Sequence, residues 1–161
     1  MSRSKRQVIK WTSIQSQADA DHLMTVYRSF HDSCIREIAV QNREFVDERQ
    51  AMHVDNRTLV RLLFQSRFPK DSVLEMLFED VLDFNWVQDA RGSDITASLI
   101  FQAVCRWHND ALHRAENLDW SLGAEDRNDY RWLVAEQARW RLVESGLGPA
   151  TLLSEPAASA S

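Results

Sequence analysis

The sequence predicts an α+β fold, mainly β, in which an N-terminal helix packs on an antiparallel sheet of about six strands. Four apolar residues near the start lie on one face of a 3.6-residue repeat: Leu23, Val26, Tyr27 and Phe30. Most later apolar residues alternate with polar ones, which is typical of strands that bury one face. The 161 residues, 44% hydrophobic and 27% charged, suffice for one globular domain that folds without a metal or a disulfide.

The N-terminal region divides into an arm and the helix. Residues 1–17 begin with several cations and show little periodicity, so we expect a flexible basic arm. The helix follows, with Asp19 or Asp21 capping its first turn. It is predicted to end near His31, because the next two residues also suit a turn better than a helix interior.

Strand-like segments follow the helix, and we expect strands over residues 34–40, 58–65, 74–78, 82–86, 95–108, 111–116 and 130–143. Residues 41–56 are polar and charged, which predicts a long hairpin arm or a loop. Asp80-Val81 marks a bend or bulge, and Asn109-Asp110 marks a tight hairpin turn.

The last predicted strand has a rival interpretation as a helix, since its Leu, Ala, Glu, Gln and Arg residues favour helices. We favour a strand because several apolar residues share one parity: Trp132, Val134, Ala138, Trp140 and Leu142. The predicted domain spans residues 18–145, and Gly and Pro near its end predict a disordered tail over residues 146–161.

Charge and cysteine usage narrow the function classes. The formal net charge of −5 argues against a surface that follows nucleic-acid phosphates, and the four scattered glycines form no phosphate loop. No apolar run is long enough for a membrane span. Cys34 and Cys105 are isolated in apolar contexts, which is typical of reduced thiols. We therefore expect a cytoplasmic protein with no nucleic-acid or membrane partner and no cofactor.

Candidate chemistry is sparse. His108, His113 and Glu116 form the densest group of metal ligands, but a hairpin places such residues in pairs without any chemical need. His31-Asp32 precedes Ser33-Cys34, yet a catalytic triad is assembled from distant positions rather than from neighbours. We therefore predict no catalytic residue and no metal site, and a metal-dependent enzyme remains the less favoured alternative.

Acidic and aromatic residues point to a protein partner. Asp80, Asp83 and Asp89 belong to a spread of acids that would steer a basic partner. Trp107 and Trp120 do not fit the predicted core, and exposed tryptophans are typical anchors at protein interfaces. These five residues are our candidates for partner binding.

The segment from Tyr27 to Ile38, and above all Phe30-His31-Asp32-Ser33, resembles a group of small, mostly uncharacterised bacterial proteins. Weaker similarity continues at Arg57–Leu59, Ser72–Phe78 and Ala138–Arg141, so that it covers roughly residues 20 to 143. Some members of the group are immunity proteins of polymorphic-toxin loci. The resemblance implies a small cytoplasmic domain that binds a toxin, with the Phe-His-Asp-Ser motif in a structural role, and it carries over no binding residue.

Together these observations predict a non-enzymatic protein-binding domain, specifically an immunity protein that neutralises a bacterial toxin by direct binding. The alternative is a homo-oligomeric structural or regulatory protein that uses a sheet edge. The sequence leaves the oligomeric state open.

Overall fold

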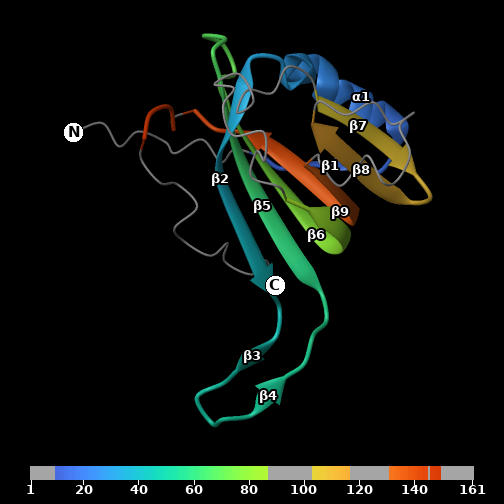
Figure 1. Cartoon of the computed structure of the whole chain (residues 1–161), viewed down its shortest axis with the longest axis vertical. Coiled ribbons are helices and arrows are strands. Elements are labelled where there is room, and N and C mark those ends of the chain that lie inside the picture. The colour runs from blue at the N-terminus through green and yellow to red at the C-terminus, as the bar shows by residue number, and fades with distance from the viewer. Residues whose placement is uncertain (1–9, 87–102, 117–130, 145, 150–161) are drawn as a thin grey trace.

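The computed structural model describes residues 10–86, 103–116, 131–144 and 146–149, and within them it shows an antiparallel sheet with one α-helix against it (Figure 1). The strand order is β2-β5-β6-β9-β8-β7, with β1 paired to β9. A separate two-stranded sheet, β3-β4, lies at the far end of a projecting hairpin. The α+β, mainly β, prediction is confirmed.

The elements follow one another along the chain as β1 (Thr12–Ile14), α1 (Gln17–Val26), a 3₁₀ turn η1 (Arg28–Phe30), β2 (Ser33–Asn42), β3 (Phe45–Val46), β4 (Met52–His53), β5 (Thr58–Ser66), β6 (Val73–Asn85), β7 (Ala103–His108), β8 (Ala111–Glu116) and β9 (Trp132–Leu142). The bend predicted at Asp80 lies inside the continuous strand β6, where Asp80 has φ 52°. Asn109 and Asp110 form the predicted tight turn, both with positive φ.

The N-terminal arm prediction is wrong for its last residues. Thr12–Ile14 pairs with β9 and Ile14 is buried, because these residues complete the side of β9 that β8 leaves open. The helix cap is Ser16, whose Oγ accepts a hydrogen bond from the Asp19 backbone N–H at 3.2 Å. The Asp19 carboxylate in turn accepts a hydrogen bond from the Gln15 backbone N–H, and this bond is the largest cause of its lowered pKa. At the start of the predicted tail the Gln65 side chain donates to the carbonyl of Gly146, whereas residues 150–161 of that prediction lie outside the described residues.

The centre of the sheet carries two rows of apolar side chains that cross the strands. Trp140, Met76 and Leu62 form one row, and Ala138, Phe78 and Val60 form the other. The helical segment packs on these rows through buried side chains that the sequence analysis placed there: Leu23, Tyr27 and Phe30. This confirms the predicted contact between helix and sheet.

Strand β9 buries different faces in its two halves. Leu133 and Ala135 are buried in the first half, whereas Ala138 and Trp140 are buried in the second, two exposed residues later. The single parity predicted for this strand is therefore wrong. Two other changes occur near this point of β9. Its neighbour on one side changes from β8 to β1, and the register of its pairing with β6 shifts after Val81. The predicted strand type is correct.

Two acidic residues, Glu75 and Glu116, are buried beside arginines. Glu75 accepts hydrogen bonds from Arg61 and, at 2.7 Å, from Arg141, whose guanidinium also stacks on Trp11 with 4.5 Å to the ring centroid. Glu116 accepts from Arg114 at 2.8 Å. A buried carboxylate needs such partners, because unpaired charge in the interior is strongly unfavourable.

Arg114 itself lies inside the core and is only 3% exposed. Its guanidinium carbon lies 4.5 Å from the ring centroids of both Phe30 and Phe64. The faces of aromatic rings attract cations, so these rings replace part of the water that the guanidinium loses. The motif residue Phe30 is thereby joined to β5 and β8 at once.

We predict that Arg114→Ala lowers the free energy of unfolding by about 3–5 kcal/mol, because the buried Glu116 loses its close partner and keeps Arg131, 3.8 Å away, as its remaining ion-pair partner among the described residues. The double variant Arg114→Met/Glu116→Gln removes both charges and retains the packing, so it should recover at least half of that loss. Urea unfolding followed by tryptophan fluorescence measures both. Equal losses in the two variants would contradict this account of the pair.

Candidate protein-binding surface

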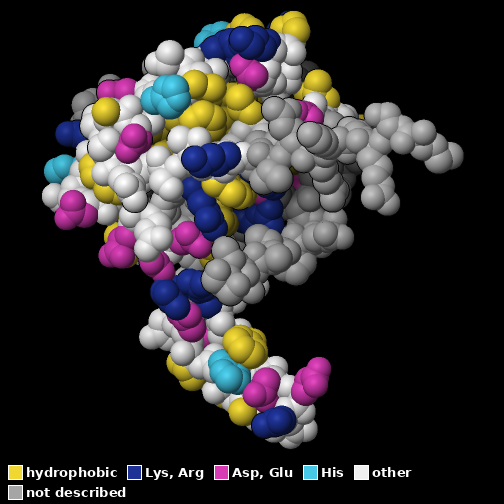
Figure 2. All heavy atoms as spheres, turned by 180° about the vertical axis from the view of Figure 1, so that it is seen from behind, with side chains coloured by type: hydrophobic (Ala, Val, Ile, Leu, Met, Phe, Trp, Pro, Cys, Tyr) yellow, Lys and Arg dark blue, Asp and Glu magenta, His cyan; other side chains and the backbone are white. Residues whose placement is uncertain are grey.

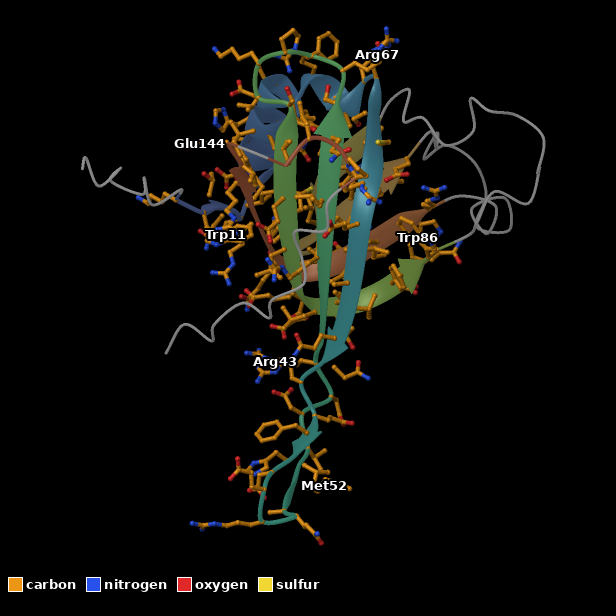
Figure 3. All side chains as sticks on the ribbon, turned by 90° about the vertical axis from the view of Figure 1, so that its left-hand side faces the viewer. Trp11, Arg43, Met52, Arg67, Trp86 and Glu144 are labelled. Atoms are coloured by element: carbon orange, nitrogen blue, oxygen red, sulfur yellow. The ribbon has the colours of Figure 1, made fainter. Side chains whose placement is uncertain are left out.

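The most prominent surface feature is the hairpin that connects β2 to β5, which we call the arm and define as residues 43–57. It projects from the end of the sheet as a narrow extension, with Arg43 at its root and Met52 near its far end (Figure 3). Its only regular structure is the β3–β4 pair, in which Phe45 faces His53 and Val46 faces Met52.

Hydrogen bonds fix the arm at both ends. At the tip, Asp47 Oδ1 accepts from the backbone N–H groups of Arg49 and Ala51, each at 2.9 Å. This Asx-type turn needs a left-handed residue, and Gln50 supplies it with φ 64°. At the root, the Arg43 N–H donates to the Arg57 carbonyl at 3.1 Å. The arm is therefore an ordered hairpin.

The paired residues give the arm two different faces. Phe45 and His53 stack with 4.4 Å between ring centroids and 7° between ring planes, and His53 Nε2 lies 2.9 Å from Asp47 Oδ2. This contact with His53 is the largest cause of the lowered pKa of Asp47. Val46 and Met52 form the next cross-strand pair and point to the opposite face, because side chains alternate along a strand.

Apolar side chains of the arm are largely in solvent. Phe45 is 57% exposed, Val46 60%, Met52 74% and Val54 70%. In Figure 2 the arm is the protrusion below the body, where hydrophobic side chains stand among charged ones. A hairpin with no core of its own gains little stability from such residues, whereas an exposed cluster of them is typical of a binding surface.

These residues were not predicted as a binding surface, because residues 41–56 are mostly polar and charged. The signal was present in two short apolar islands, Phe45-Val46 and Met52–Val54, on either side of the turn at Asp47–Gln50. Alternation over two or three residues is too short to distinguish a hairpin from a loop.

Ion pairs surround the root of the arm. Arg57 donates to both carboxylate oxygens of Asp55, at 2.7 and 2.5 Å, and Arg43 approaches the same carboxylate at 4.0 Å. The bonds from Arg57 lower the pKa of Asp55 to about 2. Arg57 also lies 3.9 Å from Asp80, so the predicted partner residue Asp80 belongs to the root of the arm.

The other candidate residues for partner binding are scattered. Asp83 is exposed on β6, and its carboxylate accepts from the next backbone N–H, of Phe84. Trp107 is partly buried against the core, and its backbone N–H donates to Gln17 of the helix at 2.8 Å. It is therefore a packing residue here. Asp89 and Trp120 lie outside the described residues.

The Phe-His-Asp-Ser motif forms the corner between helix and sheet. Phe30 is fully buried, and Ser33 is buried with its Oγ donating to the Phe30 carbonyl at 2.5 Å. His31 and Asp32 lie outward, with side chains 57% and 32% exposed and 3.3 Å apart. Arg28, Ser29 and Phe30 are all left-handed, with φ between 52° and 58°.

The potential metal ligands do not converge. The ring centroids of His108 and His113 lie 5.9 Å apart on the two paired strands of the β7–β8 hairpin. Glu116 is committed to the buried Arg114, and alternation along β8 places it on the face opposite to His113. Within the described part of the chain, no three His, Cys, Asp or Glu side chains form a group that could hold a metal ion. Cys34 and Cys105 are free thiols.

The fold and surface define a mainly β, α+β domain with a projecting arm that exposes apolar side chains. Comparison with protein-family models, with curated proteins and with solved structures finds no match. Among the described residues, no helix has the length and apolar character to cross a membrane.

We predict that Arg57→Gln raises the pKa of Asp55 from about 2 toward 3.8, because the bidentate hydrogen bond is lost. Since the pKa of Asp55 is lowered on folding, its stabilising effect is present above pH 4 and disappears as the pH falls toward 2. Carbon-13 NMR titration of the carboxyl group measures the shift. Arg49→Gln serves as the control, because Arg49 makes no bond to Asp55 and should leave the pKa unchanged.

We also predict that Ser29→Gly stabilises the protein by about 0.5–1 kcal/mol. A left-handed L-residue is disfavoured by about 1–2 kcal/mol, and the greater freedom of glycine in the unfolded chain offsets part of the gain. Thermal unfolding measures the change. Ala18→Gly, in the exposed part of α1, should destabilise by up to about 1 kcal/mol. A destabilising Ser29→Gly would show that the turn is not strained.

Proposed function

We propose that this chain is a non-enzymatic protein-binding domain, specifically an immunity protein that neutralises a bacterial toxin in the cytoplasm by direct binding. The observation that carries the proposal is the arm, whose apolar side chains are exposed although its backbone is ordered. Binding through an ordered element loses less conformational entropy than binding through a flexible loop. The similarity of the Phe-His-Asp-Ser segment to toxin-immunity proteins supplies the class of partner.

The side chains of the arm suit an interface. Phe45 and Met52 are large, and Met adapts its shape to the surface of a partner. A few such anchors commonly provide most of the binding energy, while the surrounding polar residues exclude water. The arm therefore replaces the scattered tryptophans of the sequence analysis as the proposed anchor.

Charge favours a basic partner. The whole chain has a net charge of −5, and the arm carries Glu44 and Glu48, which have no ion-pair partner among the described residues. Of the arm cations, Arg43 and Arg57 share the single carboxylate of Asp55, and Arg49 has no ion-pair partner among the described residues, so the arm carries four acids against three arginines. Unpaired acids beside apolar anchors speed the approach of a basic surface and disfavour an acidic one.

The proposal predicts that a toxin module is encoded beside the gene for this chain, and that module, as an inactivated domain, is the partner to use in a biolayer binding assay. Val46→Asp/Met52→Asp should weaken binding at least about tenfold, because it places two charges among the anchors. Growth of bacteria that express the active toxin should fail with the same variant and be rescued by the wild-type chain.

Leu147→Asp is the matched control, since Leu147 is 61% exposed and lies outside the arm. It should bind as the wild type does. If the wild-type chain forms no complex at micromolar concentration, the immunity proposal fails. If the wild-type chain binds and the arm variant binds equally well, the arm is not the binding element.

A further inference from the structure

The outer edge of β2 is the second unusual surface, and what it suggests is independent of the arm. Among the described strands β2 has one neighbour, β5, so its other edge pairs with no described strand, and in its first half the Arg36 side chain donates to the Pro149 carbonyl. Ile38 faces Leu62 and Val40 faces Val60 across the β2–β5 pair. Leu62 and Val60 are 3% and 0% exposed, whereas Ile38 and Val40 are 37% and 52% exposed.

The two apolar rows of the sheet therefore end in solvent at this edge. One row runs from Trp140 through Met76 and Leu62 to Ile38, and the other from Ala138 through Phe78 and Val60 to Val40. Cross-strand pairs of this kind are the units that stabilise a sheet. A further strand beside β2 would extend both rows by one residue each.

The second half of this edge lacks the features that usually prevent another strand from pairing with it. Natural edge strands commonly carry charges, prolines or bulges that block another strand. In β2 the charged residues Arg36 and Glu37 and the register shift lie in the first half. The following residues, Ile38–Asn42, contain neither charge nor proline.

We propose that a second copy of this chain occupies the edge, with the two β2 strands antiparallel about a twofold axis at Ala39. In this register Ile38 of each copy faces Val40 of the other, so each apolar row continues into a row of the second copy. Glu37 faces Gln41 of the other copy, and no two like charges are opposed. The interface uses none of the arm, so the dimer is compatible with toxin binding.

Neighbouring registers are less favourable. In an antiparallel dimer whose twofold axis is perpendicular to the sheet, paired residues have their side chains on the same face. The alternative registers therefore place the axis at a neighbouring residue of β2. An axis at Ile38 would place Val40 against Arg36, and an axis at Val40 would place Ile38 against Asn42. Only the axis at Ala39 pairs apolar with apolar at both positions.

Sedimentation velocity of the full chain tests the dimer. The weight-average mass should rise from 18.7 kDa toward twice that value as the concentration increases to about 100 µM, as a short interface predicts. Ile38→Lys/Val40→Lys should remain monomeric, because lysines then oppose each other in both pairs. Val46→Lys/Met52→Lys, with two arm residues that are more exposed than Ile38 and Val40, is the control and should dimerise. A wild-type chain that stays monomeric at the highest concentration overturns the proposal.

Disulfide trapping tests the register. In the background Cys34→Ser, a cysteine at Ala39 would face its own copy at a Cα separation of about 4.5–5.5 Å, within the range of a disulfide. Gln41→Cys in the same background is the control, because the two copies of residue 41 would be about 13 Å apart. Non-reducing electrophoresis should show covalent dimer for the first variant only. Equal cross-linking of both variants, or none of either, rejects the axis at Ala39.

Discussion

The structure depends on the entry of Phe30 into the core. Its ring lies 5.0 Å from Tyr27 and 4.9 Å from Phe64, and the Arg114 guanidinium covers it. These contacts connect the helical segment to β5 and β8. They require the chain to reverse between α1 and β2 within a few residues, which the left-handed turn at Arg28–Phe30 achieves and the Ser33 hydroxyl holds. Burial of the ring thus offsets an unfavourable backbone.

The sequence alone was sufficient to predict those elements whose pattern of buried residues lies within one short segment. Alternation in Thr58–Ser66 and the Asn109-Asp110 pair predict a strand and a hairpin turn because one short segment contains the whole signal. It was insufficient for β1, where three residues carry too little pattern to reveal pairing with a distant strand. It was also insufficient for β9, whose buried face changes with its neighbours rather than with its own residues.

The candidate binding surface was predictable only in part, because the exposure of a side chain depends on which other segments pack against it. The arm was expected as a hairpin or a loop, but the exposure of Phe45 and Met52 follows from the absence of any layer against them. Conversely, Glu75 and Glu116 look like surface acids in the sequence, and only the fold reveals the arginines beside them. Because core and arm share no residues, changes to the arm can alter the proposed binding surface while the body of the sheet keeps its stability.

The pairing of Thr12–Ile14 with β9 has a consequence for biosynthesis. Thr12 meets Trp140, about 130 positions later, so this part of the sheet forms only after nearly all of the described chain has left the ribosome. Until then β1 has no partner strand and Ile14 has no burial site. Contacts between such distant segments slow folding. Newly made molecules therefore pass through a period in which β1 is unpaired and open to chaperones.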